Sequence, residues 1–165
     1  RWWRPRNGTL SREQIARTAN TLQTASPNQI RVVVTHHPLH VTRPEDEVHR
    51  PTHHREALST WAGAGADVLL SGHIHLPVVV PVDTDPPRGQ PRPESAARRL
   101  WSVQAGTAVS SRIREHIPNT VMLLEALSGE RHGRLCGCEV WQCPPRGGDF
   151  VRVASQRLAL SPLPT

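Results

Sequence analysis

The apolar residues of the chain recur first at the spacing of a helix. Ser11 and Gln14 have the pattern of a capping box, in which each side chain binds the other residue's free backbone N–H. The apolar residues that follow predict a helix over residues 11–24, and a second apolar stripe predicts a helix over residues 53–62. We expect the buried stripes at Ile15, Ala19 and Leu22 in the first helix and at Leu58, Trp61 and Ala62 in the second.

Near-continuous apolar runs at residues 30–35 and 67–71 flank the second predicted helix. Such runs are typical of strands that are buried on both faces. A strand, a helix and a strand with short connections form a βαβ unit, so these two strands should be parallel. Further strands are expected at residues 78–82, 100–104, 119–125, 134–142 and 150–154, the last three of them antiparallel.

This order of elements predicts an α/β fold in a single domain over residues 1–165. We expect the ordered part to span about residues 10–154, with a loop at residues 83–99 and a tail at residues 157–165. The 16 prolines and 11 glycines of the chain indicate that loops take up much of its length. Hydrophobic residues make up only 36% of the chain, but they are dense enough in the strands to form a core.

The net charge of +6 comes from arginine, because all 20 of the Lys+Arg residues are Arg. A basic balance is compatible with nucleic acid or phosphate partners. The arginines are scattered in runs of no more than two, and one Phe and no Tyr offer little for base stacking. A basic nucleic-acid-binding module is therefore kept as an alternative, and nucleic acid is otherwise expected only as a substrate.

The three cysteines are too few and odd in number for a disulfide framework, which fits a protein of the reducing cytoplasm. Cys136, Cys138 and Cys143 could form part of a zinc knuckle with His132. We favour buried apolar roles, because no second pair of cysteines completes four ligands. No apolar stretch approaches the ~20 residues of a membrane span, so we expect no membrane partner.

Histidines follow each of the two predicted parallel strands directly. His36 and His37 come after the first strand, and Gly72-His73-Ile74-His75 follows the second. The carboxyl ends of parallel strands meet at the edge where open α/β sheets bind ligands. Neutral imidazole is a good ligand for zinc, iron and manganese. The pattern therefore predicts a metal site formed by His36, His73 and His75, the last two facing the same side if their backbone is extended.

These motifs carry a resemblance to a known family. Residues 32–38 (Val-Val-Val-Thr-His-His-Pro) and residues 72–75 resemble the last two signature motifs of the calcineurin-like metallophosphoesterases. Residues 103–112, with Gly106-Thr107, and the later Pro118-Asn119 are also similar to bacterial members. The resemblance covers about residues 10–150.

The resemblance implies a fragment of a four-layer αββα sandwich and a hydrolase with two divalent metal ions, such as Mn, Fe or Zn. His36 and His73 would bind one metal and His75 the second. His37 would lie just outside the ligands, where it could contact the substrate phosphate or orient a water. A hydrogen bond to a loop explains His37 equally well. Two such ions convert a bridging water to hydroxide that attacks phosphorus.

Two arginines follow the Gly106-Thr107 turn and could contact an anionic substrate. They are Arg112, which we take as the candidate substrate-binding residue, and Arg114. A solvated loop explains both nearly as well. The substrate could be a phosphomonoester or a phosphodiester, including a cyclic nucleotide, a nucleic acid or a phospholipid headgroup.

The family's first three motifs, Asp-x-His, Gly-Asp-x-x-Asp and Gly-Asn-His, do not occur in this chain. In the family they supply the bridging carboxylate, most ligands of one metal and the histidine credited with protonating the leaving group. We therefore expect the chain to be the C-terminal half of such a domain, to hold at most one metal weakly, and to be inactive alone. A non-catalytic remnant that binds at most one metal is the alternative.

Other acidic and histidine residues are expected to be ordinary surface groups. The acidic substitutes to consider are Asp46, Asp67, Asp83 and Asp85, and their spacing favours surface or capping roles. The histidines between positions 49 and 54 are expected to be solvated, although this loop could also cover the substrate.

Overall fold

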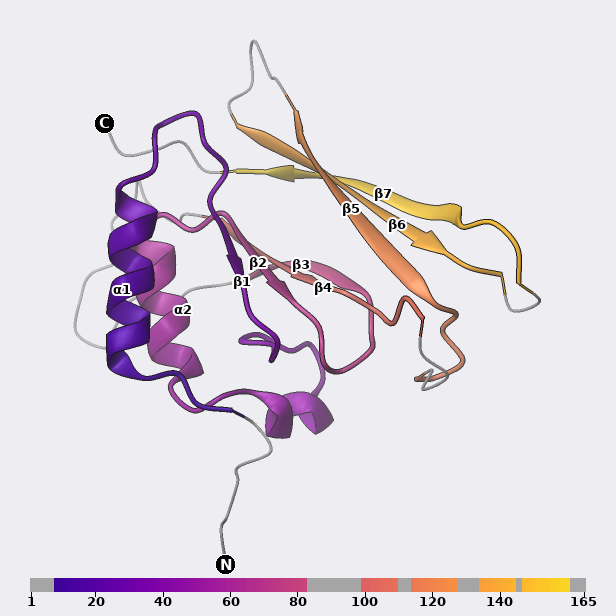
Figure 1. Ribbon diagram of the computed structural model, residues 1–165, viewed down its shortest axis with the longest axis horizontal. Coiled ribbons are helices and arrows are strands. Elements are labelled where there is room, and N and C mark those ends of the chain that lie inside the picture. Colours follow the sequence, from indigo (N-terminus) through magenta and orange to yellow (C-terminus); the bar gives the residue numbers. More distant parts are fainter. Residues whose placement is uncertain (1–7, 83–98, 110–113, 128–133, 145–146, 161–165) are drawn as a thin grey trace, which may run out of the picture.

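The computed structural model describes residues 8–82, 99–109, 114–127, 134–144 and 147–160. Helices α1 (Arg12–Gln23) and α2 (His54–Gly63) lie side by side over one face of a four-stranded sheet (Figure 1). A three-stranded sheet lies on the other side of that sheet. A short 3₁₀ helix, η1 (Pro44–His49), lies near the ends of the strands of the four-stranded sheet. The α/β class predicted from the sequence is confirmed.

The helical layer forms as its sequence pattern predicts. The Ser11 hydroxyl accepts from the Gln14 N–H at 3.1 Å, and the Gln14 side chain accepts from the Ser11 N–H at 2.9 Å, so the capping box is present. Trp61 of α2 is 2% exposed and donates its indole N–H to the carbonyl of Ile15 in α1 at 3.0 Å. The predicted stripes are buried with one exception in α2. Leu58 is only partly buried, and Ala57, which was not predicted, is fully buried in its place.

The first sheet has the strand order β1-β2-β4-β3. Its strands are β1 (Val32–Val34), β2 (Val68–Ser71), β3 (Val78–Val82) and β4 (Leu100–Gln104). The pairs β1/β2 and β2/β4 are parallel, which confirms the βαβ unit, and β3 is antiparallel to β4. The carboxyl ends of β1, β2 and β4 therefore meet at one edge of the sheet.

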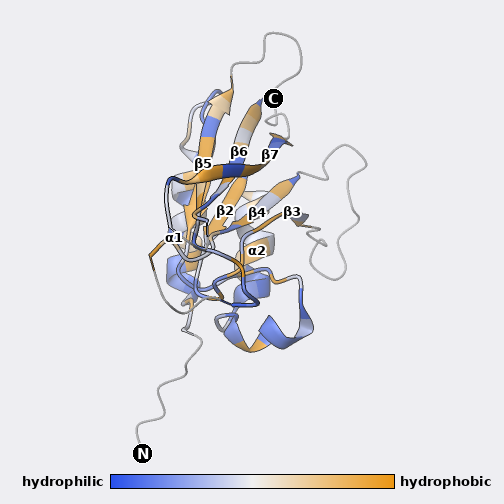
Figure 2. Ribbon diagram, turned by 90° about the vertical axis from the view of Figure 1, so that its right-hand side faces the viewer, coloured by the Kyte–Doolittle hydropathy of each residue, from blue (hydrophilic) through white to orange (hydrophobic). Residues whose placement is uncertain are grey.

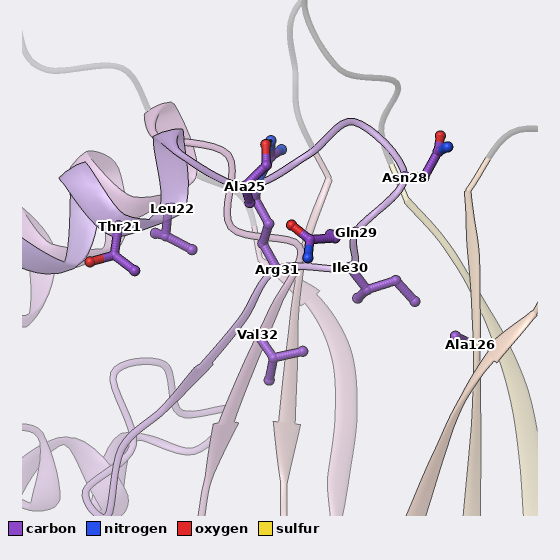
Figure 3. A pocket seen from close by; sticks show the side chains of 9 residues that line it. All are labelled: Thr21, Leu22, Ala25, Asn28, Gln29, Ile30, Arg31, Val32 and Ala126. Atoms are coloured by element: carbon purple, nitrogen blue, oxygen red, sulfur yellow. The ribbon is translucent and has the colours of Figure 1, made fainter.

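Burial of β1 on both faces was predicted, and that prediction is wrong. Val33 is 8% exposed, but Val32 and Val34 are 41% and 73% exposed. The reason is position: β1 is an edge strand, and Val32 lines an open pocket of about 560 Å³ instead of packing against a layer (Figure 3). The central strand β2 is buried on both faces, as predicted.

The second sheet has the order β5-β6-β7 and is antiparallel throughout. Its strands are β5 (Thr120–Leu127), β6 (Leu135–Gln142) and β7 (Val151–Ala159). Apolar side chains of both sheets form a common core, in which Val68, Trp101 and Val103 pack with Cys136, Cys138, Leu158 and Leu160. Figure 2 shows most of the strands as hydrophobic segments of the chain.

The predicted tail from residue 157 is wrong over its first part. Strand β7 continues to Ala159, Leu158 is fully buried, and Leu160 donates its N–H to the carbonyl of Arg134 at 3.0 Å. Two contacts hold this segment in place. It pairs with β6, and the apolar residues at its end face the core between the sheets. Residues 161–165 and most of the predicted loop, residues 83–98, lie outside the described residues.

The cysteines of β6 behave as the favoured interpretation predicted. Cys136 and Cys138 are 3% and 1% exposed within the core between the sheets. Burial raises the pKa of both thiols, that of Cys138 to about 11, so they stay protonated at neutral pH. His132, the other candidate ligand of a zinc knuckle, lies outside the described residues.

The described residues form three layers, one of helices and two of strands, and no second helical layer is present among them. The expected four-layer αββα sandwich thus stays a prediction. Within the same residues, no helix is long and apolar enough to cross a membrane.

Candidate metal centre

The histidines that follow β1 and β2 lie side by side because backbone pairing continues past the strands. Thr35 donates its N–H to the carbonyl of Leu70 at 2.9 Å, and Gly72 donates to the carbonyl of His36 at 3.2 Å. The Nδ1 atom of His73 lies 3.2 Å from the Nε2 atom of His36. Two of the three histidines of the predicted metal site, His36 and His73, are thus in contact.

His37 joins this pair to form what we call the three-histidine group (His36, His37 and His73). One ring nitrogen from each residue lies within 4.8 Å of those of the other two. The ring centroids of His37 and His73 are 4.1 Å apart, and those of His36 and His37 are 5.1 Å apart. Three converging imidazoles suit one zinc-like ion, as in catalytic sites with three protein ligands and an open position for water.

His75 lies outside the three-histidine group, although it is near enough to contribute to the low pKa of His73. The backbone explains the difference. His73 and His75 have φ values of 69° and 61°, in the left-handed region, so the segment is not extended as the same-side arrangement required. Ile74 between them is buried. The assignment of His75 to a second metal stays a prediction.

His37 is held in one orientation by the backbone of η1. Its Nδ1–H group donates a hydrogen bond to the carbonyl of His49 at 3.1 Å, which leaves the lone pair of Nε2 free to bind a ligand. The backbone of Gly8 closes over the ring, and a Cβ atom there would lie 3.2 Å from its Cδ2. His37 is thus hydrogen-bonded to the backbone, as one of its two interpretations predicted, although its partner belongs to η1 and not to a loop. A metal-binding histidine also usually donates a hydrogen bond from its other ring nitrogen to a group such as a backbone carbonyl.

Burial and the neighbouring histidines lower the pKa of His37 and of His73, which favours the neutral form of both rings. Burial lowers the pKa of His73 to about 4, with further contributions from His37, His36, His49 and His75. Burial is also the main cause of the lowered pKa of His37. A histidine must be neutral to bind a metal ion, so at pH 7 no proton competes for His73.

His49 is a neighbour of the site that the sequence reasoning missed. Its ring centroid lies 5.1 Å from that of His73, and its carbonyl supports His37. From its position in the sequence we expected His49 to be solvated, in a loop that could also cover the substrate. The signal that could have found it is the start of η1, where Pro44 and three acidic residues form a helix-starting pattern.

No carboxylate belongs to the metal-binding group that the described residues form. Asp46 and Asp67 were expected in surface or capping roles, but each is 1% exposed, so a place at the surface is wrong for both. Each carboxylate is buried because an arginine pairs with it, Arg114 with Asp46 at 2.6 Å and Arg134 with Asp67 at 2.5 Å. The other acidic candidates, Asp83 and Asp85, and the candidate substrate ligand Arg112 lie outside the described residues.

Comparison of the chain with models of known protein families gives no match, and comparison with curated protein sequences gives none either. The resemblance to the calcineurin-like metallophosphoesterases thus depends on the sequence motifs alone.

Proposed function

We propose that this chain carries the histidine side of the metal centre of a metal-dependent phosphoesterase, a hydrolase of phosphate monoesters or diesters. The observation that carries the proposal is the convergence of three imidazole nitrogens within 4.8 Å at the carboxyl edge of the parallel strands. The family resemblance falls on the same residues. Arg112 is the proposed contact to the substrate phosphate.

In this proposal the residues of the chain bind and orient, and do not transfer protons. His36 and His73 supply neutral nitrogens for one ion, and the carbonyl of His49 fixes the ring of His37 beside them. When bound, divalent ions such as Mn, Fe or Zn would supply a water of low pKa and offset negative charge on the phosphoryl oxygens. A second ion would need His75 together with carboxylates.

The proposal also accounts for what the isolated chain should lack. Three neutral imidazoles leave the repulsion between two divalent cations without an anionic bridge. The family's first three motifs supply that bridge and the residue that protonates the leaving group. The chain alone is therefore proposed to bind at most one ion and to hydrolyse no substrate.

Metal content measured by mass spectrometry tests the binding part of the proposal. We expect bound metal to fall in His36→Ala and His73→Ala and to stay unchanged in His116→Ala, which removes an exposed histidine outside the group. Equal metal content in all four proteins would contradict the site. Hydrolysis of a chromogenic phosphodiester by the chain with added manganese would contradict its inactivity.

One observation favours a second candidate, a non-catalytic remnant that binds one metal. Within the described residues no carboxylate joins the three-histidine group. The genomic sequence upstream separates the two candidates. Codons for Asp-x-His and Gly-Asn-His motifs in frame would support the phosphoesterase, and their absence would support the remnant.

A further inference from the structure

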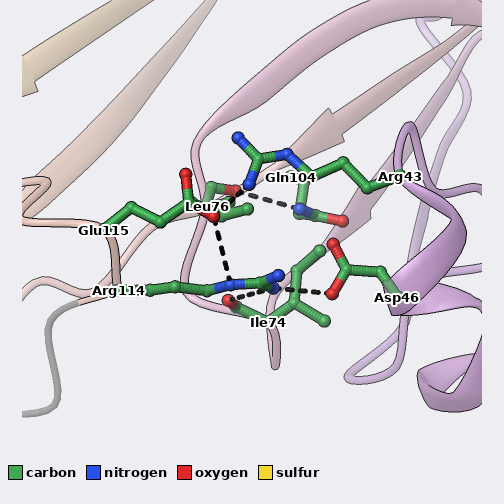
Figure 4. Close-up of polar contacts among 7 residues, drawn as sticks. All are labelled: Arg43, Asp46, Ile74, Leu76, Gln104, Arg114 and Glu115. Atoms are coloured by element: carbon green, nitrogen blue, oxygen red, sulfur yellow. Dashed lines mark hydrogen bonds and ion pairs between the residues drawn. The ribbon is translucent and has the colours of Figure 1, made fainter.

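A network of charged side chains joins η1 to the loop that carries His73 (Figure 4). Arg114 donates from Nη1 to Oδ1 of Asp46 at 2.6 Å, and the same nitrogen lies 3.5 Å from the carbonyl oxygen of Ile74. Asp46 belongs to η1, whereas Ile74 lies between His73 and His75. One guanidinium therefore contacts two separate segments of the histidine site.

The contact between Asp46 and Arg114 is buried on the aspartate side. Asp46 is 1% exposed, and the Arg114 side chain is 28% exposed. An unpaired carboxylate at such depth is strongly unfavourable, so the two residues must meet for η1 to keep its position. A pair of this kind fixes a distance between segments, which a solvent-screened surface pair does not.

Both contacts of the guanidinium lead to candidate metal ligands. Asp46 lies three residues before His49, whose carbonyl accepts a hydrogen bond from Nδ1 of His37 at 3.1 Å. The other contact is to the residue that directly follows His73. We propose that Arg114 and Asp46 are positioning residues of the metal centre, which hold His37 and His73 at the separation needed to bind one ion.

Glu115 and Arg43 complete the network and change how Arg114 is interpreted. The Glu115 carboxylate is bonded to Arg43 and lies 3.7 Å from Nε of Arg114. Arg114 thus lies between two carboxylates, which balance its charge. An arginine balanced in this way offers little to an anionic substrate, so positioning is the better account of Arg114 than substrate contact.

Gln104 fixes another point of the same loop. It is 2% exposed and donates from Nε2 to the carbonyl of Leu76 at 3.0 Å. The loop between β2 and β3 is thus held at two carbonyls, one by a neutral amide of β4 and one by the guanidinium of Arg114. Only the guanidinium also reaches η1, so its loss should disturb the metal centre and not merely the loop.

The inference rests on the proposed function in one respect, since it takes the three-histidine group as the seat of the metal. Residues that orient metal ligands typically contribute about 10- to 100-fold in affinity. They also affect the geometry of the ligand set, which residues that act only on stability leave unchanged.

A titration of the full chain with cobalt(II) tests the proposal, because the visible absorption of cobalt reports the geometry of its ligands. We expect Asp46→Asn and Arg114→Gln each to weaken cobalt binding by about ten-fold. We also expect both to shift or weaken the absorption bands at saturating metal. Arg114→Lys keeps the charge without the planar fork and should recover part of the affinity.

The pair of Asp67 and Arg134 provides a matched control. It is also a buried aspartate with an arginine, but it lies before β2, at the opposite end from the histidines. Asp67→Asn and Arg134→Gln should lower the melting temperature at least as much as the test variants, yet leave cobalt affinity and the absorption bands unchanged. Circular dichroism identifies the variants that are folded, and the matched lysine variants serve where a glutamine variant does not fold.

Each outcome decides the proposal. Wild-type affinity and bands in folded Asp46→Asn and Arg114→Gln would overturn it, and so would equal losses of affinity in Asp67→Asn. If cobalt binding is lost in His36→Ala but unchanged in the Asp46 and Arg114 variants, only this inference fails. If the wild-type chain binds no cobalt, this inference and the proposed function fail together.

Discussion

At one end of β2 a buried charge is paired, whereas at the other end three imidazole nitrogens converge and no carboxylate of the described residues joins them. Asp67, just before β2, accepts from Arg134 at 2.5 and 3.0 Å and from the N–H of Arg31 at 2.8 Å. His73, just after β2, lies among imidazoles that help burial to lower its pKa to about 4. About 13 Å of strand separates the two ends.

The difference separates the residues that stabilise the fold from those that are available for binding. Around Asp67 both carboxylate oxygens accept hydrogen bonds from residues of the fold, so this aspartate is committed to holding the structure together. Around His73 three ring nitrogens converge, and a cation could take the place of the hydrogen bond between His73 and His36. The paired end should therefore govern stability and the histidine end metal affinity, and the following predictions test that division.

The largest expected effect is on stability at the paired end. Asp67→Ala should lower the free energy of unfolding by about 3–5 kcal/mol, because it leaves Arg134 without its partner in a partly buried site. Urea denaturation measures the change. The double variant Asp67→Leu, Arg134→Met should recover much of the loss, since it removes both charges together. A loss below about 1 kcal/mol in Asp67→Ala would contradict the comparison.

The second prediction concerns metal affinity at the histidine end. His37→Ala should weaken the binding of zinc by at least about 100-fold, the upper limit for a residue that only orients a ligand, because it removes one of three converging nitrogens. Competition with a chromogenic chelator measures the affinity. His49→Ala is the matched control, since it keeps the backbone carbonyl that supports His37 and should change affinity by less than about ten-fold. Equal effects would place His37 outside the ligand set.

A smaller effect is expected in the helical layer, away from both ends of β2. Ser11→Ala removes one half of the capping box of α1 and should cost about 1 kcal/mol of unfolding free energy, with no change in metal affinity. Thermal unfolding followed by circular dichroism measures it. Ser59→Ala, inside α2, should stay within about 0.5 kcal/mol of the wild type.

The smallest expected effect is a pH dependence in the core between the sheets. Burial raises the pKa of Cys138 from 9.0 to about 11, so between these values the unfolded thiol is ionised and the folded thiol is not. Its stabilising contribution is complete below pH 9 and is lost as the pH rises toward 11. Urea denaturation at pH 8 and pH 10 should show this loss in the wild type and a smaller one in Cys138→Ala.

Local patterns in the sequence were sufficient for the elements themselves. The capping box of Ser11 and Gln14 and the apolar stripe that follows predicted α1 to within one residue at each end. The two apolar runs around α2 predicted the parallel pair β1/β2, and with it the edge where His36 and His73 meet. These features depend on residues that are near one another in the chain, so periodicity and turn chemistry reveal them.

Features that depend on residues far apart in the chain could not be predicted from the sequence. The burial of Asp46 and of Asp67 follows from arginines that are 68 and 67 positions away, and no local spacing indicates such a pairing. The exposure of Val34 depends on β1 being an edge strand of its sheet. The place of His49 beside His73 depends on how η1 folds back over the sheet edge.

The left-handed backbone at His73 and His75 has a consequence for how an ion would be received. Residues other than glycine in such conformations cost about 1–3 kcal/mol each and persist only where the surroundings hold them. That strain is overcome when the chain folds, so the loop has little conformational entropy left to lose on binding. The preorganisation of this loop is thus supplied by the fold and not by an arriving ion.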